Sequence, residues 1–269
     1  MHIAAIQMAV VEDDKNATIA KARERILKCR GADLVILPEL WNIGFMSFDR
    51  YHAEAEDRNG PTLTAMRECA REIGAWIHAG SFVEWDGDRF YNTSFLLKPD
   101  GEIAARYRKI HLFPYNSREN ELLTPGEEIA VADTPLGRFG LATCFDLRFP
   151  ELFRRMVEAG AEFLLICSAW PYPRLEHWLL FNRVRALENQ CVLVSANSVG
   201  TNRDTRFVGN SMIVDPMGAI LAGGGDGERI VRGEIGRREI EEVRDTFPAL
   251  AARREWVNLP ADRLGEETP

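Results

Sequence analysis

The sequence predicts an α/β protein with a mixed sheet, and three observations support this fold class. Short apolar runs of strand length recur along the chain. Several of these runs are separated by segments whose apolar residues recur at helical spacing, and this alternation is typical of α/β folds. Two pairs of runs are joined by turn residues alone, which predicts hairpins and therefore some antiparallel pairing.

Nine apolar runs are expected to form strands: Ile3–Ala9, Leu34–Leu37, Trp76–Val83, Ser94–Leu97, Phe139–Ala142, Phe163–Cys167, Val192–Ser195, Met212–Val214 and Ile230–Ile235. Four helices are expected around Ile19, Ala22 and Ile26; Leu63, Met66, Ala70 and Ile73; Leu152, Phe153, Met156 and Val157; and Trp178, Leu179, Val184 and Leu187. One hairpin is expected to join Tyr91–Leu97 through Pro99-Asp100-Gly101 to Glu102–Arg108, and another to join Ser211–Val214 through Asp215-Pro216-Met217-Gly218 to Ala219–Leu221.

Length and composition indicate one globular domain. The chain has 269 residues, of which 46% are hydrophobic, so it can bury a large core. We expect the domain to span residues 1–259 and the polar residues 260–269 to form a C-terminal tail. Acidic residues outnumber basic ones by 41 to 33, which argues against a nucleic-acid partner. The chain lacks a membrane-length apolar run, and Met1–Val10 does not resemble a signal peptide, so a cytoplasmic protein without a membrane partner is expected.

The five cysteines do not predict a disulfide framework or a metal site. They are odd in number and scattered, and they show no C-x-x-C pair and no histidine at ligand spacing. Most of them are therefore expected to be buried thiols that behave as small hydrophobic residues.

The first segment with chemical character is the run Leu34–Leu37, which is followed by Pro38 and Glu39. Proline cannot continue a hydrogen-bonded ladder, so Glu39 is expected at a strand end, where ligand clefts form in α/β folds. A carboxyl group in such apolar surroundings is a candidate general base. A solvated loop carboxylate, or an acid at a helix N-terminus, is the alternative.

The second segment is Ala105–Phe113, in which three cations alternate with apolar or aromatic residues. Strand alternation places Lys109 on the same face as Tyr107 and His111, opposite the two arginines. The cations therefore need not form one basic patch. A solvated strand face explains this pattern, and a catalytic Lys109 is the alternative.

The third segment is Phe139–Leu152, which reads as a strand, a cysteine at its end, a short polar turn and a helix starting near Pro150. A cysteine on such a strand-to-helix elbow has its sulfur at the mouth of a cleft, near backbone N–H groups that can stabilise a thiolate or an oxyanion. Cys144 is therefore a candidate nucleophile. A further buried thiol is the alternative.

Together and in this order, the three segments resemble the nitrilase (carbon–nitrogen hydrolase) superfamily. The resemblance is carried by Pro38-Glu39, Arg108–Phe113 and Cys144–Glu151, with flanking similarity from Ile3–Gln7 to about Trp256. Four further segments agree with it: Tyr91–Thr93, Leu123–Gly126, Arg185–Asn189 and Gly209–Gly218.

The resemblance implies a four-layer α-β-β-α sandwich with mixed sheets. It also implies a homodimer or a higher homo-oligomer, in which residues 247–269 could reach a partner subunit. The catalytic set implied is Cys144 as nucleophile, Glu39 as general base and Lys109 as oxyanion stabiliser. A second carboxylate is expected beside Lys109, with Glu119 favoured over Glu121.

The implied reaction requires no metal and no organic cofactor. Cys144 attacks an amide carbon while Glu39 moves the proton, and Lys109 and the Phe145 backbone N–H stabilise the oxyanion. Ammonia leaves, and water then hydrolyses the thioester. The chain looks most like the ω-amidase and deaminated-glutathione amidase group, which cleaves small dicarboxylate monoamides. An N-carbamoyl amide hydrolase is the main alternative, followed by a nitrilase or a non-catalytic scaffold.

The pocket wall is expected in Ser168–Arg174, whose Trp-Pro-Tyr-Pro stretch departs from that group and leaves the substrate open. Trp170 is expected to line the pocket, and Arg174 or Arg203 to face a substrate carboxylate. Arg148 and Glu151 could bind the substrate, but charges so close to the start of a packed helix more often pair, so they are expected to fix the elbow. His111 and His177 are expected to serve in packing or hydrogen bonding. The helix Trp178–Gln190 is expected to carry a polar network of Asn182, Arg183, Arg185 and Glu188.

Overall fold

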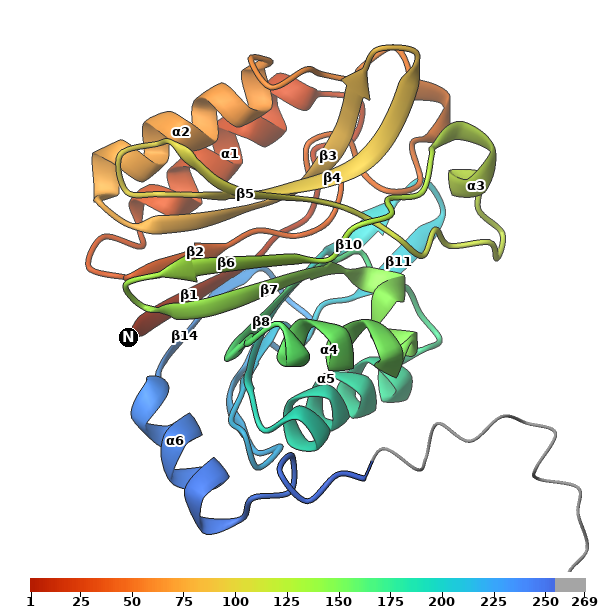
Figure 1. Ribbon diagram of the computed structural model, residues 1–269. Helices are drawn as coiled ribbons and strands as arrows, with labels where there is room; N and C mark the ends of the chain where they lie inside the picture. Colours follow the sequence, from red (N-terminus) through yellow and green to blue (C-terminus); the bar gives the residue numbers. More distant parts are fainter. Residues whose placement is uncertain (255–269) are drawn as a thin grey trace, which may run out of the picture.

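The computed structural model describes residues 1–254, which form two stacked six-stranded mixed sheets (Figure 1). The first sheet has the order β14 (Arg229–Glu234), β1 (His2–Gln7), β2 (Leu34–Ile36), β3 (Trp76–Asp86), β4 (Arg89–Leu97) and β5 (Ile103–Arg108). The second has the order β13 (Ile220–Gly223), β12 (Met212–Val214), β9 (Val192–Asn197), β8 (Phe163–Ser168), β7 (Gly137–Thr143) and β6 (Ala130–Thr134). A separate hairpin pairs β10 (Val199–Asn202) with β11 (Thr205–Val208).

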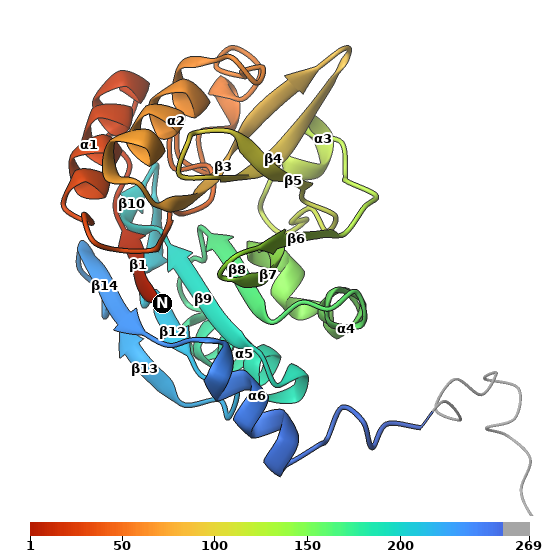
Figure 2. The ribbon, with the colours of Figure 1, turned by 60° about the vertical axis from the view of Figure 1, so that its left-hand side comes forward.

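Helices cover the outer faces of the two sheets (Figures 1 and 2). Helices α1 (Lys15–Leu27) and α2 (Pro61–Ile73) pack on the first sheet, and α4 (Pro150–Glu158) and α5 (Leu175–Asn189) pack on the second. The short α3 (Glu119–Leu122) follows β5, and α6 (Arg237–Thr246) follows β14. This arrangement confirms the predicted α-β-β-α sandwich with mixed sheets.

The core has an apolar layer between the two sheets and one under each helical layer. Residues such as Ile36, Phe139 and Leu165 fill the space between the sheets and are fully buried. Each side chain of this size stabilises the fold by about 1.5–3 kcal/mol through burial. Because both faces of the central strands are covered, these strands read as continuous apolar runs rather than as alternating ones.

All nine predicted runs contain strands, and both predicted hairpins are antiparallel pairs, β4 with β5 and β12 with β13. The predicted helices are α1, α2, α4 and α5, and α4 begins at Pro150 as expected. Strands β6, β10 and β11 and helices α3 and α6 were not predicted. Helix α6 fully buries only Ile240, so its sequence shows almost no apolar face.

The expected domain boundary at residue 259 and the tail 260–269 lie outside the described residues, as does most of the segment expected to reach a partner. All five cysteines are free thiols. Within residues 1–254, the helices are all too short or too polar to cross a membrane.

Candidate active site

Glu39 lies just beyond the end of β2 and is fully buried. Its Oε2 accepts a hydrogen bond of 2.9 Å from the backbone N–H of Ala169, which follows β8 in the other sheet. The preceding Pro38 ends the ladder and packs against Gly80, whose φ is +65°. A Cβ at Gly80 would lie 2.1 Å from the carbonyl oxygen of Pro38, so only glycine fits there. The acid is therefore held where the ends of the two sheets meet.

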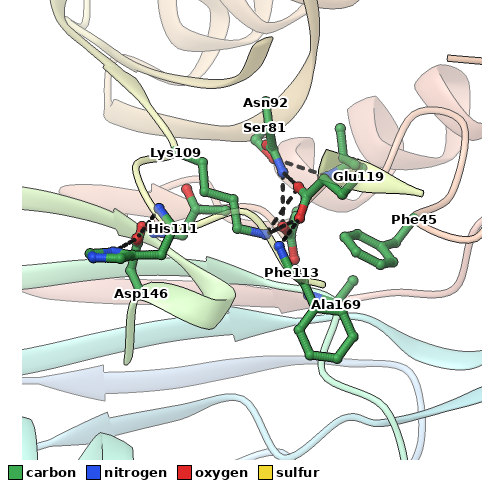
Figure 3. Close-up of polar contacts among 12 residues, drawn as sticks. Phe45, Ser81, Asn92, Lys109, His111, Phe113, Glu119, Asp146 and Ala169 are labelled. Atoms are coloured by element: carbon green, nitrogen blue, oxygen red, sulfur yellow. Dashed lines mark hydrogen bonds and ion pairs between the residues drawn. The ribbon is translucent and has the colours of Figure 1, made fainter. Parts of the chain in front are cut away.

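Lys109 is the first residue after β5, and its side chain is also fully buried (Figure 3). Its Nζ donates to Glu39 Oε1 at 2.8 Å and to Glu119 Oε1 and Oε2 at 3.0 and 2.9 Å. Its carbonyl oxygen accepts from Gly126 N at 2.8 Å. A Cβ at Gly126 would lie 2.2 Å from the Arg108 carbonyl oxygen, so this glycine allows the chain to hold Lys109 in place.

The structure places Glu119, and not Glu121, against Lys109. Glu119 is buried at the start of α3, and its Oε2 also accepts from Phe113 N at 2.7 Å, whereas Glu121 is exposed. The Asn92 amide donates to Glu39 Oε1 at 2.9 Å and to Glu119 Oε1 at 2.8 Å. Sequence reasoning included Asn92 in the resembling segment Tyr91–Thr93 but gave it no role, although an amide inside the apolar strand β4 was a signal for one.

The network combines one buried cation with two buried carboxylates. Burial alone lowers the pKa of Lys109, but the negative charges of Glu119 and Glu39 outweigh it and raise that pKa well above its usual value. Burial raises the pKa of Glu119 and Glu39 raises it further, while Lys109 opposes both effects. Lys109 therefore stays protonated at physiological pH.

Cys144 follows β7 and begins a 3₁₀ helix, Cys144–Arg148, with the left-handed φ of +48°. Its side chain is 6% exposed. Burial, followed by the negative charge of Glu39, raises the pKa of the thiol well above its usual value, although Lys109 and the Ser168 hydroxyl oppose the shift. The resting residue is therefore a thiol, and it needs a base to become a nucleophile.

Cys144 opens into a small cavity with about 20 Å³ of free volume. The lining residues are Phe45, Phe113, Cys144, Phe145, Arg148, Ala169, Trp170, Pro171 and Arg174. The three residues expected at the pocket, Phe145, Trp170 and Arg174, thus all line it. A larger hollow of about 210 Å³ beside Arg106 and Arg108 contains none of the candidate catalytic side chains, so we place the site at the smaller cavity.

Arg148 does not pair with Glu151, so this expectation was wrong. Its guanidinium turns to the aromatic wall instead, 5.1 Å from the centre of the Trp170 ring, and Nη2 donates to His177 Nδ1 at 3.1 Å. Burial, followed by the positive charge of Arg174, lowers the pKa of Arg148. In the described part of the chain, no carboxylate forms an ion pair with Arg148 or Arg174.

Arg203 is not a residue of the cavity. Its guanidinium donates to both carboxylate oxygens of Asp13, at 2.9 and 2.8 Å, and also to Asp49. His111 serves in hydrogen bonding as expected, with Nδ1 2.7 Å from Asp146 Oδ1. Among residues 1–254, no three His, Cys, Asp or Glu side chains are grouped so that they could hold a metal ion.

Two stacked mixed sheets between helical layers, with an acid, a lysine and a cysteine at their shared end, define the nitrilase-like class of α/β sandwich. The chain belongs to the carbon-nitrogen hydrolase family, whose model matches residues 2–245. It is therefore an enzyme that hydrolyses carbon–nitrogen bonds.

Three relatives show how close the similarity is. A 2-oxoglutaramate amidase of Paenarthrobacter nicotinovorans is 36% identical over 88% of this chain and 83% of its own length. The omega-amidase NIT2 of Homo sapiens is 32% identical over 93% and 92%. The crystal structure of Saccharomyces cerevisiae Nit3, from branch 10 of the nitrilase superfamily, superposes with a TM-score of 0.87 at 31% identity, covering 94% of this chain and 96% of that one.

Proposed function

We propose that Cys144, Glu39 and Lys109 act as nucleophile, general base and oxyanion stabiliser. Glu39 takes the thiol proton as Cys144 attacks the amide carbon, and the oxyanion forms against the Lys109 ammonium and the Phe145 backbone N–H. Phe145 is the second residue of a 3₁₀ helix, where N–H groups have no partner within the helix. Glu39 then protonates the departing ammonia and activates the water that hydrolyses the thioester, while Glu119 holds Lys109 charged and oriented.

The proposed substrate is a small dicarboxylate monoamide, with its carboxamide at Cys144 and its free carboxylate at Arg148 and Arg174. The observation that supports this substrate most directly is that both arginines line the same cavity as Cys144, and neither has a carboxylate partner among the described residues. A planar guanidinium binds a carboxylate through two parallel hydrogen bonds, and such bonds strengthen in apolar surroundings. The names of the relatives, a 2-oxoglutaramate amidase and an omega-amidase, support the same substrate class.

The test compares four- and five-carbon monoamides such as succinamate with neutral amides of the same length, and measures ammonia and carbon dioxide separately. N-carbamoyl amino acids, N-carbamoyl amines and simple nitriles complete the panel. A charge-assisted hydrogen bond contributes about 1.5–3 kcal/mol, so kcat/KM should favour the charged amides by about 10- to 150-fold. Ammonia should appear without carbon dioxide.

Arg174→Met should reduce that preference, whereas Arg203→Met, which changes a guanidinium outside the cavity, should leave it unchanged. Equal rates for charged and neutral amides would contradict the assignment of the two arginines. Activity on N-carbamoyl compounds alone would assign the chain to the carbamoyl hydrolases instead.

We further propose that the protein works as a cytoplasmic homodimer or higher homo-oligomer. Five free cysteines fit a reducing compartment. Large apolar side chains lie exposed on α5 and on the β12–β13 hairpin: Leu180, Leu187, Met217, Ile220 and Leu221. Light scattering should show an oligomer that the double substitution Leu180→Lys and Leu187→Lys dissociates; a monomeric wild type would contradict the proposal.

A further inference from the structure

Asp146 is a fully buried carboxylate in the elbow that carries Cys144, and it does not line the substrate cavity. Its Oδ2 accepts from the Thr143 backbone N–H at 2.8 Å and from the Tyr107 hydroxyl at 2.7 Å. Its Oδ1 lies 3.1 Å from the His111 backbone N–H and 2.7 Å from His111 Nδ1. A carboxylate offers about four acceptor positions, so this one is fully used.

The four donors come from the two segments that supply the nucleophile and the lysine. Thr143 directly precedes Cys144, while Tyr107 and His111 lie two residues before and two residues after Lys109 (Figure 3 shows Lys109, His111 and Asp146). One side chain therefore connects the start of the elbow in the second sheet to both sides of Lys109 in the first.

A second contact supports the same connection. The His111 ring stacks on Phe149 at the end of the elbow, with ring centres 3.7 Å apart and planes at 7°. The segment around Lys109 is thus joined to the elbow on both sides of Cys144, at Thr143 and at Phe149.

We propose that Asp146 is a positioning residue for the hydrolytic reaction, which sets where Lys109 stands relative to Cys144. Reacting groups must meet within a few tenths of an ångström, and a misplacement of about 1 Å can lower the rate about 100-fold. The Asp146 carboxylate sets this position without contacting the substrate, because it holds the backbone at Thr143, next to Cys144, and at His111, close to Lys109.

Asp146→Asn is the informative substitution because an amide cannot reproduce the four contacts. If the NH₂ group replaces Oδ2, it faces the Thr143 N–H; if it replaces Oδ1, it faces the His111 N–H. Either orientation removes one backbone connection. Tyr107→Phe removes one of the four donors to Asp146, together with the acceptor of the Ile110 N–H at 3.3 Å, and keeps the ring in the core, so it provides a milder variant that tests the same connection.

Glu56→Gln is the matched control. Glu56 is also a buried carboxylate that accepts several hydrogen bonds, from Thr62 N and Oγ1 and from Lys15, but none of these partners belongs to the site. It should lower the melting temperature as Asp146→Asn does, with kcat within about twofold of wild type.

The measurements are kcat and KM for succinamate, the melting temperature, and the rate at which iodoacetamide alkylates Cys144 without substrate. Asp146→Asn should lower kcat about 10- to 100-fold and leave KM within about threefold, and Tyr107→Phe should lower kcat about three- to tenfold. The alkylation rate should change in both variants, and it reports on the site even if the true substrate is another amide. A kcat that stays within twofold of wild type in both folded variants, or that falls equally in Glu56→Gln, would overturn the proposal.

Discussion

Replacing Glu119 by Gln should impair catalysis strongly while leaving the triad residues in place. All three partners of this carboxylate donate to it: Lys109 to both oxygens, Asn92 to Oε1 and Phe113 to Oε2. Whichever way the glutamine amide turns, its NH₂ group faces two donors. The substitution also removes the carboxylate charge that contributes most to raising the pKa of Lys109.

The magnitude follows from these contacts. A hydrogen bond to a charged group contributes about 1.5–3 kcal/mol, and a change of about 1.4 kcal/mol in the barrier is a tenfold change in rate. If Lys109 stabilises the transition state less by this free energy, kcat should fall about 10- to 150-fold. Glu39 still pairs with Lys109 at 2.8 Å, so the protein should stay folded.

The assay is steady-state release of ammonia from succinamate, with the melting temperature measured alongside. Glu121→Gln is the matched control, because Glu121 lies two residues further along α3, is exposed and pairs only with Arg118 at 2.9 Å in the described part of the chain. It should keep wild-type kcat. A Glu119→Gln enzyme within about threefold of wild type, or an equal loss in Glu121→Gln, would refute the reasoning.

Three further predictions concern the cysteine and the lysine. Cys144→Ala should abolish turnover in a folded protein. Mass spectrometry of wild type with substrate should find the acyl adduct on the peptide that contains Cys144. An adduct on Cys167 or Cys191 instead would exclude the assignment. Lys109→Ala should lower kcat by a factor of about 10² or more. Lys109→Arg should restore little activity, because a planar guanidinium cannot replace the ammonium group. An effect confined to KM would contradict this role. Because burial and Glu39 raise the pKa of Cys144 well above its usual value, iodoacetamide should alkylate it ever faster as pH rises from 7 through about 9, and a plateau below pH 8 would show a thiolate in the resting enzyme.

The sequence predicted the strands that are buried on both faces, because such burial requires mostly apolar residues. Strands covered on both faces, such as β8 and β9, are buried throughout and consist mostly of apolar residues. The hairpin β10–β11 has exposed positions and few apolar residues, so no run marked it. The edge strand β6 does carry a short apolar run, Ile129–Ala132, but this run is half alanine and the strand has exposed positions, so its signal is weak. Helix α6 was also not predicted, because a helix without an apolar face shows only helix propensity and capping residues, which are weak signals in a sequence.

At the site, the residues beside strand ends and the carboxylate Glu119 could be anticipated, but the rest of their hydrogen-bond partners could not. Glu39, Lys109 and Cys144 stood out because each follows a recognisable strand, whereas the role of Asn92 became clear only when β4 placed its amide between two carboxylates. The expected pair of Arg148 and Glu151 failed because spacing along the chain does not say which way a side chain turns. Three aromatic rings lie within reach of Arg148, those of Phe145, Trp170 and Phe181, and they hold the guanidinium at the cavity.

The left-handed backbone at Cys144 means that the fold holds its candidate nucleophile in a conformation that a residue with a Cβ disfavours. A side chain with a Cβ costs about 1–2 kcal/mol in this conformation, and glycine would adopt it freely. Glycine at position 144 would therefore relieve this backbone strain but discard the nucleophile, so selection for thermostability alone does not protect Cys144. Any engineering of this enzyme for heat resistance has to select for turnover at every round, because at this position the backbone conformation and the chemistry favour different amino acids.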